Sequence, residues 1–167
     1  MSDVLGRPGL HGPEWHGPER HGPERHGPES HGTELLGHLW DAEEYLTLDR
    51  VRRYAEASGD SNAIHIDPAA ARAVGLAAPV AHGLLLVAII LAYAQRWAGS
   101  SGAVITGCDT RFVRPVLVGE EPTVLHLTGT LASEGHITAT VWVLDADGVT
   151  HRPVIRPIRL SYAPAPG

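Results

Sequence analysis

The chain contains no lysine and only one cysteine in its 167 residues. Without lysine, the chain cannot use a lysine Schiff base, a lysine general base or a Walker-type phosphate lysine. The single Cys108 cannot form an internal disulfide, and the first ten residues lack the charged and apolar regions of a signal peptide. These absences predict a protein of the reducing cytoplasm.

Positive charge is also scarce, with 13 arginines against 19 acidic residues and a formal net charge of -6. This balance has the wrong sign for neutralising nucleic-acid phosphates, so we expect no nucleic-acid partner. Hydrophobic residues make up 43% of the chain, which is enough for one domain with a proper core. Two large domains are not expected.

The first part of the chain, residues 1–36, is dominated by a five-residue repeat that begins with His-Gly. Its prolines and glycines oppose helix formation, so we predict a disordered tail before a folded domain of residues 37–167. Histidine recurs at His11, His16, His21, His26 and His31. In an extended polyproline chain these neighbours would lie ~16 Å apart. A solvated extension is therefore the favoured interpretation, with weak metal binding as the alternative.

A helix is predicted over residues 48–58. Thr47 can cap its start, its apolar residues share one face, and Gly59 follows as a C-terminal stop. Three arginines fall largely off that face: Arg50, Arg52 and Arg53. We expect them to be solvated, and the alternative is a docking patch for an acidic carrier protein.

A longer apolar helix is predicted over residues 83–98. Its first twelve positions are apolar on nearly every side, so it must be buried. It is shorter than the about 20 apolar residues that cross a bilayer, and Gln95 and Arg96 interrupt it. We therefore place it in the centre of a domain without membrane contact. A short helix over residues 69–74, started by Asp67-Pro68, comes before it.

Alternating apolar and polar residues over 123–131 and 136–148 predict antiparallel strands joined by a turn. Together with the buried helix they indicate an α+β fold. Pro153 and Pro157 cannot donate ladder hydrogen bonds, so the last strand is expected to be bulged or at a sheet edge.

A carboxylate and an imidazole lie five residues apart in the segment YAEASGDSNAIHID, residues 54–67. Asp60 and His65 would be about 140° apart around a helix and on opposite faces of a strand. Only a folded-back loop brings them together, and Gly59 and Asn62 tolerate such a loop. A purely structural role is the alternative, with Asp60 closing the loop and His65 a satisfied core histidine.

Three motifs in this order resemble the MaoC-like, or (R)-specific enoyl-thioester hydratase, family: YAEASGDSNAIHID, then AHG before the apolar helix, then FVRPVLVGE. The resemblance spans about residues 46–120. It implies a hot-dog fold, in which an antiparallel sheet wraps around a long central helix, and a homodimer with active sites near the interface. It also implies reversible addition of water to trans-2-enoyl thioesters of coenzyme A or acyl carrier protein, giving (3R)-3-hydroxyacyl thioesters.

The resemblance implies that Asp60 and His65 are the catalytic pair, with Asp60 as general base and His65 as its partner in proton delivery. The implied substrate-binding residues are Asn62, His82 and Gly83. The Gly83 N–H would stabilise the enolate oxygen. His82, at the start of the helix, has chiefly a structural role, with substrate contact as the alternative. The family implies no metal and no cofactor.

Two positions depart from the family pattern. Members commonly carry Asn-Pro where this chain has Asn62-Ala63, so the loop loses a φ constraint. Some hydratases also place a serine on the central helix to hold the acid, whereas residues 87–91 offer no hydroxyl. Both differences bear on how firmly Asp60 is held.

Two other functions remain open at this point. A hot-dog thioesterase often carries an acid on the central helix, but residues 83–98 contain neither Asp nor Glu, and no Gly-x-Ser-x-Gly string occurs. A non-catalytic subunit that binds acyl thioesters is the second alternative, and the presence of Asp60 and His65 argues against it. Arg111 and Arg114 are expected to be strand-end surface residues, with contact to pantetheine phosphates as the alternative.

Overall fold

The structure is a computed structural model that describes residues 37–144 and 151–167. The predicted disordered tail lies outside these residues. The helices are α1 (Leu48–Ser58), α2 (Ala63–Ile66), α3 (Pro68–Ala73) and α4 (Gly83–Ser100). The strands are β1 (His38–Leu46), β2 (Ala103–Asp109), β3 (Thr123–Ser133), β4 (His136–Leu144), β5 (His151–Pro153) and β6 (Ile158–Pro164).

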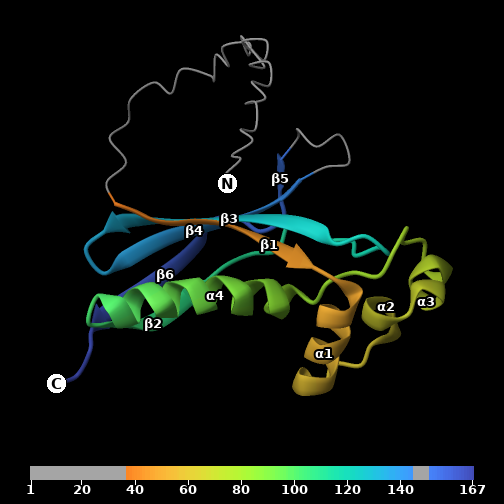
Figure 1. The fold of residues 1–167 in the computed structure, drawn as a ribbon, viewed down its shortest axis with the longest axis horizontal. Helices are drawn as coiled ribbons and strands as arrows, with labels where there is room; N and C mark the ends of the chain where they lie inside the picture. The colour runs from red at the N-terminus through yellow and green to blue at the C-terminus, as the bar shows by residue number, and fades with distance from the viewer. Residues whose placement is uncertain (1–36, 145–150) are drawn as a thin grey trace, which may run out of the picture. The chain divides into compact units, whose positions relative to one another are not determined.

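One antiparallel sheet and one long helix form the core. The strand order is β1-β3-β4-β6-β2, and β5 pairs with β4. Helix α4 runs along one face of this sheet (Figure 1). Alternate residues of β3 and β4 pack in the same core as α4, among them Leu125, Leu127, Ile137 and Val141. The α+β prediction with a central helix and a wrapped sheet is thus confirmed.

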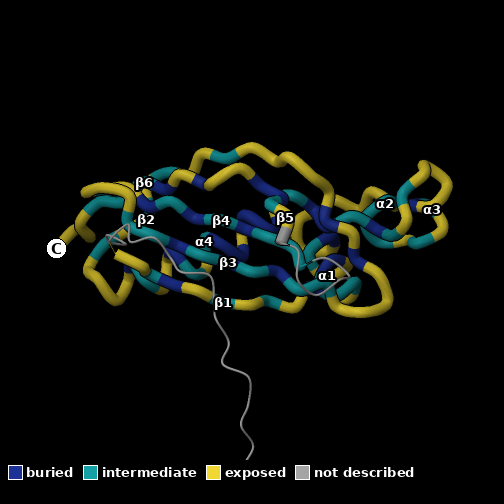
Figure 2. The backbone as a smooth tube through the Cα atoms, turned by 90° about the horizontal axis from the view of Figure 1, so that it is seen from above, coloured by how far each residue is buried: buried dark blue, intermediate teal, exposed yellow. Residues whose placement is uncertain are grey.

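Helix α4 is buried on one side only, which differs from the expectation of burial on nearly every side. Seven of its residues are buried. Leu84, Ala88 and Ala92 recur at every fourth position and are exposed. By length and composition alone α4 could cross a membrane, but its buried residues are part of the core that the sheet completes (Figure 2).

The capping signals set the ends of the short helices as predicted. The Thr47 hydroxyl accepts a hydrogen bond from the Arg50 N–H at 3.2 Å, which starts α1. Gly59 ends this helix in the left-handed conformation, with φ 76°. Asp67 starts α3 by accepting from the Ala69 N–H at 2.8 Å.

Arg50 is partly buried in an ion pair, whereas this group of arginines was expected to be solvated. Its guanidinium donates to the Glu44 carboxylate at 2.6 Å, and the Tyr93 hydroxyl donates to the same carboxylate at 2.8 Å. Burial raises the pKa of Glu44, but these hydrogen bonds outweigh it and hold the pKa below its usual value. The contacts tie α1 to β1 and α4. Arg52 and Arg53 are exposed, as expected.

The prolines interrupt the last strand rather than placing it at an edge. Strand β6 pairs with β4 on one side and β2 on the other, so it is not at an edge, and the break in pairing with β4 between Pro153 and Ile158 fits the other half of the prediction, an irregular strand. The irregularity in its pairing with β2 lies between Ile105 and Gly107, on β2. Pro153 ends β5 and Pro157 precedes β6. The two strands therefore pair with different parts of β4, one after the other.

Candidate functional site

The loop after α1 folds back through two side-chain turns. The Ser58 hydroxyl accepts from the Asp60 N–H at 3.3 Å, and the Asp60 carboxylate accepts from the Asn62 N–H at 3.4 Å. The Asn62 side-chain oxygen in turn accepts from the Ile64 N–H at 3.3 Å and starts α2. The structure therefore has the folded-back loop that the sequence predicts. It uses Asn62 as a helix cap, and contact with substrate remains a prediction.

His65 is held by the main chain of Val80. The His65 Nδ1 lies 2.6 Å from the Val80 carbonyl oxygen. A carbonyl only accepts hydrogen bonds, so Nδ1 carries the proton, and Nε2 of the neutral ring is left as an acceptor. The Val80 N–H donates to the Ile64 carbonyl at 3.1 Å, which fixes the same segment to α2. One residue thus sets both the place and the tautomer of this imidazole.

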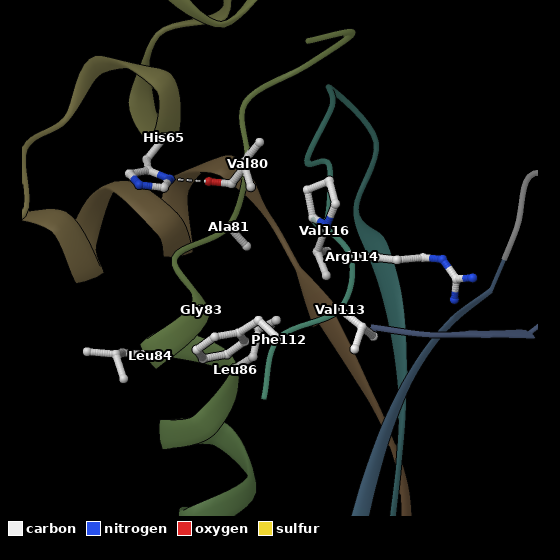
Figure 3. A pocket seen from close by; sticks show the side chains of 11 residues that line it. His65, Val80, Ala81, Gly83, Leu84, Leu86, Phe112, Val113, Arg114 and Val116 are labelled. Atoms are coloured by element: carbon white, nitrogen blue, oxygen red, sulfur yellow. Dashed lines mark hydrogen bonds between the residues drawn. The ribbon is translucent and has the colours of Figure 1, made fainter. Parts of the chain in front are cut away.

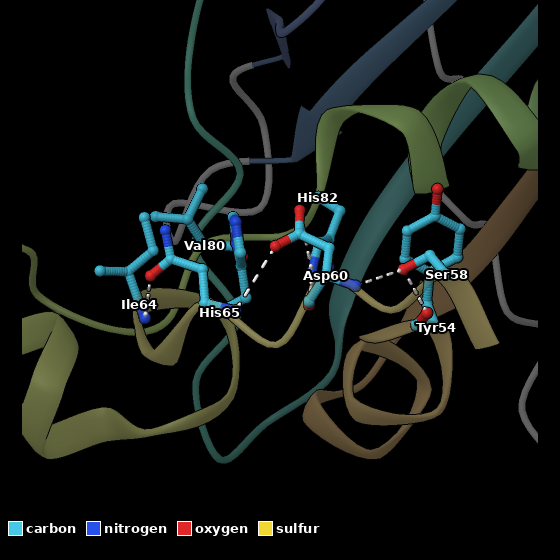
Figure 4. A network of polar contacts seen from close by, with 8 residues as sticks. Tyr54, Ser58, Asp60, Ile64, His65, Val80 and His82 are labelled. Carbon is cyan, nitrogen blue, oxygen red and sulfur yellow. Dashed lines mark hydrogen bonds and ion pairs between the residues drawn. The ribbon is translucent and has the colours of Figure 1, made fainter. Parts of the chain in front are cut away.

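His82 contacts both Asp60 and His65. It is 3% exposed, and its ring stacks on His65 with centroids 3.9 Å apart. Its Nε2 donates to the Asp60 carbonyl at 3.1 Å and lies 3.9 Å from the Asp60 carboxylate. Tyr54 covers its other side, with ring centroids 5.0 Å apart. Figure 4 shows these side chains gathered between α1, α2 and the start of α4.

One polar atom from each of Asp60, His65 and His82 lies within 4.8 Å of the others, so the three residues must be considered as a possible metal site. The two imidazole planes are only 29° apart and stacked. The His82 Nε2 donates to the Asp60 carbonyl, so this nitrogen has no lone pair available for an ion. The arrangement suits hydrogen bonding to a shared water molecule better than it suits metal coordination.

A cavity of about 490 Å³ opens beside His65 and Gly83. Its other walls are largely apolar and include Leu84, Phe112 and Val113 (Figure 3). Because a Cβ at Gly83 would lie 2.8 Å from the Phe112 ring, only glycine fits here without moving that ring. Gly83 is the first residue of α4, where backbone N–H groups have no partner inside the helix. The cavity thus combines an imidazole, free backbone donors and an apolar wall.

Three predicted site residues do not line this cavity: Asp60, Asn62 and His82. The Asp60 side chain is 56% exposed and lies beside His65, and His82 lies behind the same ring. No side chain of α4 bonds to the Asp60 carboxylate among the described residues, in keeping with the missing helix hydroxyl. The backbone of Asn62 holds this carboxylate instead. Ala63 takes the first helical position of α2, where the family commonly has proline.

Two residues that build the site, Val80 and Phe112, were not among the predicted site residues. Val80 acts through its main chain, which leaves no sequence signal. Phe112 lies in the motif FVRPVLVGE, but its contact with Gly83 joins segments that are far apart in the chain. Phe112 forms only an isolated β-bridge with Ile155, so no local pattern could have indicated the partner that its ring faces.

Comparisons with known proteins agree with this geometry. A family model described as MaoC like domain matches residues 37–140. The (R)-specific enoyl-CoA hydratase of Aeromonas caviae is 33% identical over 73 residues, which cover 44% of this chain and 54% of that protein. The 3-hydroxyacyl-thioester dehydratase X of Mycobacterium tuberculosis is 34% identical over 106 residues, 58% of this chain and 36% of that protein.

A solved structure shares the fold. The chain matches the (R)-hydratase from A. caviae involved in PHA biosynthesis with a TM-score of 0.60 and 21% identity, covering 81% of this chain and 100% of that chain. At this identity the match shows the fold alone. The chain spans only about half of the A. caviae relative in the sequence comparison and about a third of the M. tuberculosis relative.

Proposed function

Since this chain belongs to the MaoC-like domain family, we propose that it is a hydro-lyase that interconverts trans-2-enoyl thioesters and (3R)-3-hydroxyacyl thioesters. One observation carries the proposal: an imidazole acceptor and a carboxylate lie side by side next to an apolar cavity that also holds the first backbone N–H of α4. Both relatives described above are named for this chemistry.

The site residues divide the reaction between them. Asp60 and His65 hold a water molecule through their two acceptors, and one of them takes its proton as the oxygen bonds to C3. The electrons of the C2–C3 double bond move onto the thioester oxygen, which the Gly83 N–H stabilises. The proton then passes to C2 and the thioester carbonyl reforms. Asp60 is the proposed base and His65 its partner in proton delivery.

The thioesterase alternative has less support. Helix α4 carries no carboxylate over its whole length from Gly83 to Ser100, so the acid on the central helix that many hot-dog thioesterases use is missing. A non-catalytic binding subunit would not need a histidine fixed in one tautomer. The structure therefore favours hydration.

Activity on crotonyl-CoA tests the proposal. We expect the purified full chain to remove the conjugated absorbance of this substrate without releasing free thiol. The expected product is the (3R)-3-hydroxy thioester, identified by chiral chromatography after hydrolysis. Release of thiol without hydration would identify a thioesterase instead, and binding without either change would identify a binding subunit.

We also propose that a second copy of the chain covers the open side of the cavity. Three apolar residues that line it are exposed: Leu84 by 65%, Phe112 by 45% and Val113 by 43%. Such contiguous apolar surface is typical of an interface. Sedimentation velocity is expected to show a dimer for the full chain and a shift towards monomer for Leu84→Glu. A wild-type monomer at assay concentrations would contradict the proposal.

A further inference from the structure

A second hollow, of about 400 Å³, lies where the end of β2 meets the start of β6. It is lined by Asp109, Thr110, Arg111, Arg156, Pro157 and Arg159. Backbone contacts hold its two sides together: the Arg156 N–H donates to the Arg111 carbonyl at 2.9 Å, and Asp109 and Arg159 are cross-strand partners. We call this hollow the arginine pocket, after Arg111, Arg156 and Arg159.

The arginine pocket keeps a net positive charge within the described part of the chain, because three arginines line it and Asp109 is its one acidic residue. None of its three guanidinium groups makes an ion pair or a side-chain hydrogen bond there. Arginines elsewhere do find carboxylates, as Arg50 does at Glu44 and Arg53 at Asp49. In a chain with a net charge of -6, a hollow where three arginines outnumber the single carboxylate of Asp109 points to an anionic ligand.

A buried hydroxyl adds to this observation. The Thr110 Oγ lies among the lining residues and has no hydrogen-bond partner in the described structure. Buried polar atoms normally have partners, and a hydroxyl can donate to an anion after rotation about one bond. Planar guanidinium groups bind phosphate and carboxylate groups through two parallel hydrogen bonds. A carboxylate has only two oxygens for three arginines, whereas a phosphate group has more, so phosphate suits this pocket better.

We propose that the arginine pocket binds the phosphate groups on the thioester handle of the substrate, an inference that rests on the proposed function. The chain itself connects the two sites: Arg111 lines the arginine pocket, and the next residue, Phe112, lines the catalytic cavity. The pantetheine arm would run between them. Phosphate esters on pantetheine occur both in coenzyme A and on carrier proteins, and this is the chemistry the pocket recognises.

Arg114 does not belong to this pocket. Its Nη1 donates to the Pro153 carbonyl at 3.1 Å, and its guanidinium points away from His65 (Figure 3). Of the two arginines that the sequence singled out near FVRPVLVGE, only Arg111 lies among the pocket residues.

Substrates with and without phosphate test the proposal in the full chain. The variant Arg156→Ala/Arg159→Ala is compared with the wild type on crotonyl-CoA, crotonyl-phosphopantetheine and crotonyl-N-acetylcysteamine. We expect kcat/KM on crotonyl-CoA to fall at least about tenfold, since hydrogen bonds to charged groups are lost. The rate on the N-acetylcysteamine thioester, which has no phosphate, should stay within about twofold. The matched control Arg53→Ala/Arg96→Ala removes the same charge from exposed arginines elsewhere.

The arms of the experiment separate the sources of phosphate. A loss on both phosphate-bearing substrates assigns the pocket to the phosphate next to pantetheine, and a loss on crotonyl-CoA alone assigns it to the nucleotide phosphates. Equal losses with and without phosphate, or equal losses in the control variant, would overturn the proposal. Calorimetry with free coenzyme A keeps the test independent of turnover: a protein that binds coenzyme A but hydrates nothing refutes the proposed function alone. If Arg156→Ala/Arg159→Ala binds coenzyme A as tightly as the wild type and keeps its rates on both phosphate-bearing substrates, the arginine pocket does not bind phosphate.

Discussion

Replacing Asp60 by asparagine is expected to lower kcat for hydration of crotonyl-CoA by about 10²- to 10⁴-fold. The asparagine keeps the size of the side chain and an oxygen that can accept from the Asn62 N–H, so the loop should keep its shape. What it loses is the ability to take a proton. KM should change little, because Asp60 does not line the proposed acyl cavity.

His65→Gln should cause a loss of similar size, and the double variant should lose little more than either single variant, because the two groups act as a unit. Asp67→Asn is the matched control. It removes a carboxylate from the same segment, and asparagine caps a helix as well as aspartate does. Stopped-flow or steady-state absorbance measurements give the rates. Full activity in both Asp60→Asn and His65→Gln would refute the assigned pair.

Gly83→Pro is expected to lower kcat by about 10²- to 10³-fold, the effect of removing one donor to an oxyanion. Proline is favoured at the first position of a helix, where its missing N–H has no helical partner. The preceding His82 already has φ -61° and ψ 131°, the conformation that a following proline requires. The substitution therefore removes the proposed enolate donor with little change to the backbone.

Gly83→Ala separates the lost donor from added bulk. It brings the same Cβ against the Phe112 ring but keeps the N–H. We expect alanine to lose less activity than proline, and the difference measures the donor. Thermal unfolding of both variants checks that α4 and the sheet remain folded. Equal losses of kcat in the two variants would show that the Gly83 N–H does not stabilise the reacting oxygen.

Local signals explain which helices were predictable. Thr47 and Gly59 mark the two ends of α1, and the apolar run from Gly83 marks α4, so neither needs information from elsewhere in the chain. Strand β1 gave no clear signal in the sequence, because its alternation is mixed and its partner β3 lies far along the chain. The place of β6 inside the sheet depends on the same kind of distant pairing.

The features of the site could be predicted from the sequence where they are local in the chain, and not where they join distant segments. The turn that joins Asp60 to His65 lies within one short segment whose residue types favour it, so the sequence could predict it. The stacking of His82 on His65 and the contact of Phe112 with Gly83 bring separate segments together. Arg50 shows the limit most clearly, because its partner Glu44 lies on a strand that the sequence did not reveal.

Val80 holds His65 only through its peptide groups, while its side chain forms part of the cavity wall. Placing the His65 ring and shaping the cavity wall are therefore separate tasks at this residue. Any amino acid except proline, which has no N–H for the Ile64 carbonyl, preserves the first task. Exchanging residue 80 can thus change the shape of the proposed acyl cavity without displacing the imidazole.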